Sequence, residues 1–265
     1  MVDLLSIFII FIVKQKEMKL KNYEIFPNAP ITEALLDIKV QLQEGVTLDD
    51  LKDLHPKLKA RFPEINEQRV FAAQLKVGKE PTYSSGPNLA IGYLFRSQEE
   101  KKVVQYRLNG FTFNKLKPYG SWSALKSEAK ELWEPYLEKV KPIKILRIAL
   151  RYINRIEVPL PMKHFNEYIL TNPEIAPKLP QQVSHFLMRI ELPNEEIPAT
   201  AMITMTMERP DKSKKLPLIF DIDVFHQVEY KKNADKIWND FEKLRNFKND
   251  IFFDSITDKT KELFR

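Results

Sequence analysis

The chain contains no cysteine, which excludes thiol nucleophiles, disulfides, cysteine-ligated zinc and iron–sulfur clusters. Glycine is scarce, with six residues against eighteen prolines, and no stretch has the spacing of a P-loop or of a dinucleotide-binding fingerprint. The four histidines are scattered without metal-ligand spacing, and none stands beside a serine nucleophile motif. These absences remove many common site chemistries and leave open whether the protein is an enzyme. A chain without cysteine fits the reducing cytoplasm, where we expect this protein to be located.

Neither positive nor negative charge is in large excess. The formal net charge of +6 comes from 42 Lys and Arg against 36 Asp and Glu. Because this surplus is small, charge alone gives only weak support to nucleic acid as a partner.

The amino terminus carries the one long apolar run, residues 4–13, which is followed by Lys14, Gln15 and Lys16. The run is too short for a membrane-spanning helix, which takes about 20 residues. A signal peptide has its positive charges before the apolar run, whereas here Asp3 precedes it. We therefore expect residues 1–17 to be a leader outside the native protein and 18–265 to form one globular domain, with no stable membrane insertion. The alternative is a membrane-associating tail.

Apolar periodicity predicts the order of elements. Alternation of apolar and polar residues, or a short apolar run, predicts strands at 31–42, 89–95, 102–115, 146–158, 185–192, 199–208 and 216–224. Helical spacing predicts a capped helix after Thr47 that Pro56 breaks, a helix over 122–140, a short helix near 161–170 and a long helix after Ala234. Turn-rich residues predict loops at 78–87 and 208–217.

Strands in runs, with helices between the runs, indicate the α+β class with an antiparallel sheet. Each half of the chain, roughly 31–141 and 142–264, has the order strand, helix, strands, long helix. We therefore predict two structurally similar halves, with long amphipathic helices packed on one sheet face and a charged opposite face that remains open.

The charged face contains the residues with a potential binding role. Alternation places Arg147, Arg151 and Arg155 on one side of a strand, where residues i and i+4 are about 13 Å apart. Four arginines are the anion-binding candidates: Arg107, Arg147, Arg151 and Arg155. The candidates for a polar network are Asp37, Gln105, Asn109 and Asn154. Asp221 and Asp223 are two residues apart on a strand and are therefore candidate ligands of a hard metal ion.

These residues admit two interpretations. In the first, the arginines form ordinary cross-strand ion pairs with Asp37, Asp221, Asp223 and Glu191, and the segment 111–113 packs its phenylalanines in the core. In the second, the face or a pocket within it binds phosphate, nucleic acid or an acidic partner, and the same phenylalanines stack against bases.

Several short motifs, taken together, resemble a known family. They are Asn28-Ala29-Pro30-Ile31 with Glu33-Ala34, the run from Gln105 to Phe111, the step from Pro118-Tyr119 to Trp122, the run from Arg151 to Ile156, and Asp221-Ile222-Asp223. This set resembles an uncharacterised family of sporadically distributed prokaryotic proteins of about 250 residues, which implies an identity but no mechanism. A patchy distribution implies an accessory gene, for example in defence or toxin control.

The sequence thus favours a non-catalytic binding or interaction module without a cofactor, which engages a protein partner or its own copy through the charged sheet face and the loops. The alternative is a phosphate- or nucleotide-binding protein or a magnesium-dependent enzyme. There, Arg107, Arg147 and Arg151 would hold phosphate while Asp221 and Asp223 hold Mg²⁺. Nucleic-acid binding across a saddle-shaped sheet is a third possibility.

Overall fold

The computed structural model describes residues 22–76, 82–210, 214–230 and 234–265, so the predicted leader at 1–17 lies outside the described residues. Its strands form one antiparallel sheet in the order β2-β3-β4-β5-β1-β6-β9-β8-β7. The strands are β1 (Ile31–Gln41), β2 (Glu64–Lys76), β3 (Thr82–Ser97), β4 (Lys102–Arg107), β5 (Gly110–Leu116), β6 (Lys144–Pro159), β7 (Leu187–Pro193), β8 (Thr200–Met207) and β9 (Lys215–Tyr230). The predicted α+β class with an antiparallel sheet is confirmed.

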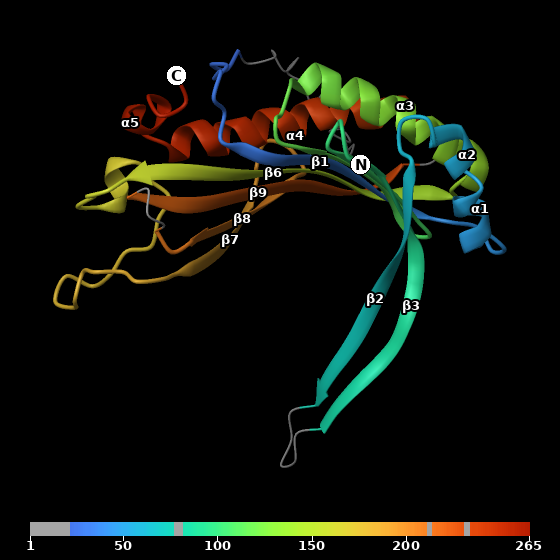
Figure 1. Ribbon diagram of the computed structural model, residues 1–265, viewed down its shortest axis with the longest axis horizontal. Helices are drawn as coiled ribbons and strands as arrows, with labels where there is room; N and C mark the ends of the chain where they lie inside the picture. The colour runs from blue at the N-terminus through green and yellow to red at the C-terminus, as the bar shows by residue number, and fades with distance from the viewer. Residues whose placement is uncertain (1–21, 77–81, 211–213, 231–233) are drawn as a thin grey trace, which may run out of the picture.

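Two long helices, α3 (Trp122–Val140) and α4 (Ala234–Ser255), lie over the same face of this sheet (Figure 1). The shorter elements are α1 (Leu48–Lys52), α2 (His55–Leu58), α5 (Asp258–Lys261) and a 3₁₀ turn, η1 (Phe165–Glu167), where the sequence predicts a short helix. None of the helices in the described ranges is long and apolar enough to cross a bilayer.

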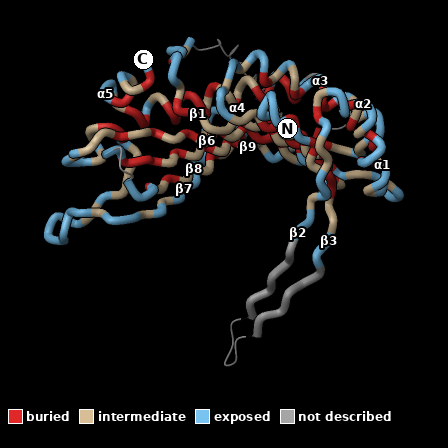
Figure 2. The backbone as a smooth tube through the Cα atoms, viewed as in Figure 1, coloured by how far each residue is buried: buried red, intermediate tan, exposed pale blue. Residues whose placement is uncertain are grey.

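The hydrophobic core lies between the helices and the sheet, where the buried residues of the tube view gather (Figure 2). Trp133 and Tyr136 of α3 are fully buried against the aromatic side chains of β4 and β5. Phe111 and Phe113 are also fully buried, so the 111–113 segment belongs to the core. Its phenylalanines are not available for stacking against bases.

The break in the first helical segment follows the sequence. Thr47 caps α1, and Asp50 completes the capping box by accepting from the Thr47 backbone N–H at 2.9 Å. Pro56 stands in the first turn of α2, where its missing N–H needs no partner, so the chain restarts as a second helix.

Three predicted boundaries are wrong. The predicted single strand 102–115 is a hairpin of β4 and β5, because Leu108 and Asn109 form a two-residue turn before Gly110. The predicted loop 78–87 is too long, since β3 already begins at Thr82 despite its turn-rich composition. The predicted loop 208–217 overlaps β9, which begins at Lys215 and continues to Tyr230.

The sheet arches beneath the helices, so its other face is concave (Figure 1). The paired strands β2 and β3 extend away from the body on the side opposite the helices. Among the residues that the structure describes, no helix lies over the concave face, and this face carries the candidate site (Figure 1).

Candidate functional site on the concave sheet face

Alternation in the middle of β1, and in β6 from Arg147 onward, sends one set of side chains into the core and the other onto the concave face. Leu36 and Leu150 are fully buried beneath the helices. Asp37, Arg147 and Arg151 point to the opposite side and are partly exposed. The strand register is therefore what gathers charged groups on the concave face.

Arg107 and Asp37 form the most enclosed ion pair on this face. The Arg107 Nη2 donates to Asp37 Oδ2 at 2.6 Å, and only 8% of Arg107 is exposed. The same carboxylate oxygen accepts from the Thr112 hydroxyl at 2.7 Å. Arg107 also donates to Thr112, Gln105 and Asn109 at 2.6, 3.0 and 3.2 Å, so each of its three guanidinium nitrogens has a partner. Four of the five guanidinium N–H groups thus have an acceptor, which holds the side chain rigidly.

Arg147 connects the two sides of the central strand pair. Its Nη1 donates to Asp37 Oδ1 at 3.4 Å, and its Nη2 donates to Asp223 Oδ2 at 3.2 Å. The guanidinium carbon also lies 4.6 Å from the centre of the Phe225 ring, a cation–π distance. Burial raises the pKa of Asp223, an effect that Arg147 and Arg151 oppose.

Arg151 and Arg155 pair with other carboxylates. Arg151 binds Asp221 at two points, Nε to Oδ1 at 2.8 Å and Nη2 to Oδ2 at 2.5 Å, and these bonds raise the pKa of the guanidinium. Arg155 donates to Glu208 at 3.0 Å and also pairs with Glu157.

A chain of amides continues the network toward β2. Gln68 donates to Gln105 at 3.3 Å, Gln105 donates to Asn114 at 3.0 Å, and Asn114 donates to Glu33 at 2.5 Å. The network therefore spans β2, β4, β5, β1, β6 and β9. The candidates from the sequence do not include Gln68, Thr112 and Asn114. Their alternation in step with Asp37 and Gln105 on neighbouring strands was the signal that could have found them.

Not every candidate from the sequence joins this network. Asn109 stands in the β4–β5 turn but reaches Arg107. Asn154 points to the helix side, where it is buried and donates to the Phe220 carbonyl at 3.0 Å. Asn154 is therefore not brought together with the arginines.

The candidate metal ligands Asp221 and Asp223 do lie on the same side of β9. Both carboxylates accept from guanidinium groups, Asp221 from Arg151 and Asp223 from Arg147. Across the described ranges, no cluster of three or more His, Asp or Glu side chains is arranged to hold a metal ion. Metal binding at this pair stays a prediction of the alternative interpretation.

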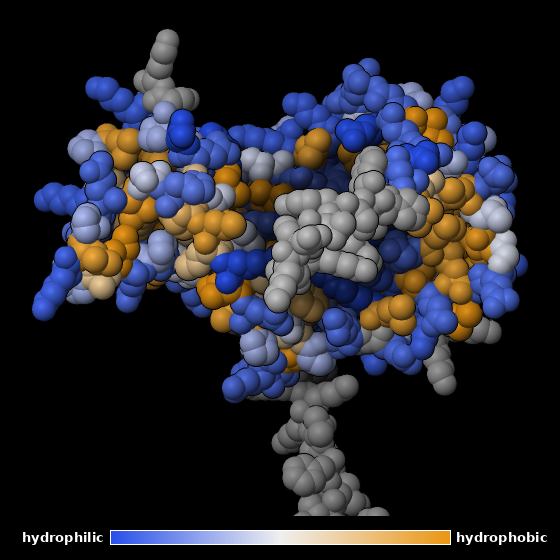
Figure 3. Space-filling view, turned by 90° about the horizontal axis from the view of Figure 1, so that it is seen from below, coloured by the Kyte–Doolittle hydropathy of each residue, from blue (hydrophilic) through white to orange (hydrophobic). Residues whose placement is uncertain are grey.

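Where the space-filling view from below leaves this side of the molecule visible, hydrophilic side chains lie beside patches of apolar surface (Figure 3). Positive and negative groups are interleaved here. Four arginines meet five carboxylates: Asp37, Asp221, Asp223, Glu157 and Glu208. These paired groups therefore carry positive and negative charge in nearly equal number.

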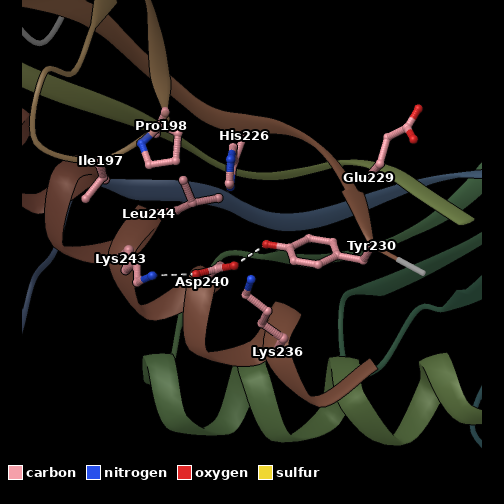
Figure 4. A pocket seen from close by; sticks show the side chains of 10 residues that line it. Ile197, Pro198, His226, Glu229, Tyr230, Lys236, Asp240, Lys243 and Leu244 are labelled. Atoms are coloured by element: carbon pink, nitrogen blue, oxygen red, sulfur yellow. Dashed lines mark hydrogen bonds and ion pairs between the residues drawn. The ribbon is translucent and has the colours of Figure 1, made fainter. Parts of the chain in front are cut away.

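A separate pocket of about 250 Å³ lies between β9, α4 and the loop before β8 (Figure 4). At its centre Asp240 accepts from the Tyr230 hydroxyl and pairs with Lys243 at 2.7 Å. Burial opposes ionisation of Asp240, but these partners hold its pKa below the usual range. Burial also lowers the pKa of His226, so the imidazole is neutral near pH 7.

Ile197, Pro198 and Leu244 form the apolar wall of this pocket. No motif in the sequence predicts this pocket; the local signal is Asp240 and Lys243 at helical i, i+3 spacing.

Comparison with known proteins adds no assignment: no family model matches the chain, and no curated protein matches it in sequence. The family resemblance of the motifs therefore stays a prediction.

Proposed function

We propose that this protein is a cytoplasmic, non-catalytic binding module whose concave sheet face receives a protein partner of mixed surface charge. One observation supports this proposal above all: the four candidate arginines of the concave face are each paired with a carboxylate of the same chain. A surface with both charges held in fixed positions suits a partner with the complementary pattern, because such patterns give specificity and orientation.

The same observation argues against an anionic ligand as the main partner. Nucleic acid needs a surplus of cations along its phosphates, and here each guanidinium already has a carboxylate within ion-pair distance. A phosphate ester at Arg151 would have to displace Asp221 from a two-point contact. The mixed charge thus favours protein over phosphate.

The proposed binding face belongs to two related halves that meet at β1 and β6. The sheet order supports this relationship: β5, β4 and β3 follow outward from β1, whereas β9, β8 and β7 follow outward from β6. Each half also ends in a long helix whose apolar stripe packs on the sheet, α3 in the first and α4 in the second. Residues 18–265 would then form one domain, with the central strand pair beneath the middle of the concave face.

Charge-swapped protein tests this proposal. The double variant Arg151→Glu/Asp221→Arg keeps opposite charges on β6 and β9 but inverts the local pattern. Tagged wild-type protein purified gently from its own host is expected to retain a protein partner in native mass spectrometry. The fraction of the swapped variant that retains this partner is expected to be at least about tenfold lower, because charges that attracted the partner now repel it.

Lys130→Ala is the matched control, because Lys130 is an exposed charge of α3, on the helix side. It should retain the partner as wild type does. Equal retention by the swapped variant would show that the concave face is not the binding surface. A retained nucleotide or metal, together with thermal stabilisation by Mg²⁺ and nucleoside triphosphate, would support the enzyme alternative instead.

A further inference from the structure

The strand β7 is the last in the sheet order, so its outer edge has no neighbouring strand in the ranges that the structure describes. Its pairing with β8 runs without a register shift from Leu187 to Pro193. The strand is also rich in exposed apolar side chains: Leu187 and Leu192 are 71% and 41% exposed. A regular, exposed edge of this kind is a template for pairing with another strand.

The other edge of the sheet is different. The pairing of β2 with β3 has register shifts between Gln68 and Arg69 and between Phe71 and Ala73. Both shifts add a residue to β3, so they bend the strand pair and interrupt the regular ladder beside the edge strand β2, which discourages further pairing. Of the two edges, β7 is therefore the one suited to accept a strand.

The side chains of β7 are complementary to themselves. In an antiparallel pairing of two copies centred on Ile190, residue 189 of each copy stands opposite residue 191 of the other. Arg189 would face Glu191 of the partner subunit, twice by symmetry. Both side chains are exposed on the concave side, and neither has an ion pair within its own described chain.

The helix side of the same pairing is apolar. Met188 and Ile190 already pack against the core, and Leu192 lies on their side of the strand. Met188 would stand opposite Leu192 of the partner subunit, and the two Ile190 side chains would meet at the centre. The pairing therefore buries the exposed Leu192 on one side and forms two ion pairs on the other.

We propose that two copies of this chain associate through β7, antiparallel and centred on Ile190, so that their sheets join into one continuous sheet. The interface is isologous, as expected of a closed dimer. It lies at the edge of the sheet and is distinct from the concave face assigned to a partner above, so either assignment can fail without the other.

Charge reversal tests the register. Arg189→Glu places a carboxylate opposite Glu191 of the partner subunit, and Glu191→Arg places two guanidinium groups opposite each other. Sedimentation velocity from low to high micromolar concentration should show a wild-type dimer. Each single variant should dissociate on the order of 10- to 100-fold more readily, because two attractive pairs become repulsive. Both residues are exposed, so the monomer fold should be unchanged by circular dichroism.

Two rescues make the test specific. The double variant Arg189→Glu/Glu191→Arg restores opposite charges and should dimerise like wild type. An equimolar mixture of the two single variants should also dimerise, because each chain then complements the other. Wild type that stays monomeric throughout would overturn the proposal. A dimer that is unaffected by either single variant, or single variants that the mixture does not rescue, would overturn it equally.

Discussion

Arg151 binds the carboxylate of Asp221 diagonally across β6 and β9, although the strand register places Asp223 directly opposite Arg151. Asp223 is thereby left to accept from Arg147, whose own opposite residue is the uncharged Gln227. Arg147 and Arg151 thus take carboxylates offset along β9. Arg147 also donates to Asp37 and so connects β9 to the Arg107 pair, whereas Arg151 and Asp221 form a separate two-point pair.

The Arg151 pair is expected to stabilise the protein modestly. Its carboxylate is 14% exposed while the guanidinium is 41% exposed, so solvent screens one partner only. Arg151→Ala leaves Asp221 without its two-point contact and should lower the free energy of unfolding by about 1–2 kcal/mol. Urea denaturation measures this change, and the variant should still fold.

Arg155→Ala is the matched control for this measurement. Arg155 comes from the same strand face, but its carboxylate partners Glu157 and Glu208 are 36% and 50% exposed. Its removal should cost less than about 0.5 kcal/mol. Equal losses from the two substitutions would show that the diagonal pair has no special role in stability.

Substitution of Asp37 should destabilise the protein more than substitution of Arg151. Asp37→Asn removes the charge that faces the enclosed Arg107, and breaking a buried pair from one side costs about 3–5 kcal/mol. The expected loss is near the lower value, since Gln105, Thr112 and Asn109 still accept from Arg107. Urea denaturation of the variant and of the wild-type protein measures this loss of stability.

The control for Asp37 is Asp53→Asn, because Asp53 pairs with Lys139 at 3.1 Å and is 66% exposed. That substitution should change stability by less than about 0.5 kcal/mol. The double variant Asp37→Leu/Arg107→Met should be more stable than either of its single variants, since it leaves no unpaired buried charge. A double variant less stable than both would contradict this electrostatic account.

The sequence predicts the strand faces well, because alternation is local. It places Asp37, Arg107, Arg147 and Arg151 on one surface with no knowledge of the tertiary structure. The partner of each arginine depends on side-chain rotamers and on the β6–β9 offset, neither of which a pattern contains. The bulge between Ile145 and Arg147 is equally invisible, and it leaves Leu146 exposed although alternation assigns it to the apolar face.

The missed β4–β5 turn has another cause. The buried apolar residues stand at even positions up to Tyr106 and at odd positions from Phe111, so the alternation changes phase at the turn. The predicted single strand overlooks this change. The Asn109-Gly110 pair was the available signal, because this dipeptide is typical of two-residue hairpins. For β3 the opposite occurred, since glycine, serine and proline suggested a loop where long-range pairing with β2 imposes a strand.

Gly110 is a position where only glycine fits. A Cβ there would lie 2.1 Å from the Ile38 carbonyl oxygen, and φ is +150°. Gly110→Ala must therefore push β5 away from β1 and should lower stability by about 2 kcal/mol or more. Gly120→Ala is the control, because a Cβ at Gly120 meets nothing within 4 Å. Thermal denaturation of both variants measures the difference, and equal melting temperatures would contradict the close approach.

Lys248 of α4 is the buried cation whose charge the fold opposes most clearly. Its Nζ lies 4.0 Å from the centre of the Tyr152 ring on β6, and the residue is 8% exposed. The ring favours the ammonium, but burial, assisted by the nearby Arg245, lowers the pKa of Lys248 to about 7. Tyr152 stays neutral, because burial raises the pKa of its hydroxyl well above the usual value.

This lowered pKa predicts that stability rises with pH. Below about pH 7 Lys248 is charged in both the folded and the unfolded state, so the cost of burying the charge is complete. Between the folded and unfolded pKa values the unfolded chain binds more protons, so the free energy of unfolding rises with pH. Lys248→Met should therefore exceed wild type in unfolding free energy by a few kcal/mol near about pH 6, and the difference should shrink toward about pH 10. Lys259→Met is the control, because Lys259 also lies over a tyrosine ring, that of Tyr168 at 4.3 Å, but is exposed and has a raised pKa. The change in unfolding free energy caused by Lys259→Met should not depend on pH between about pH 6 and pH 10. If the change caused by Lys248→Met is equally independent of pH, Lys248 keeps its proton in the folded protein.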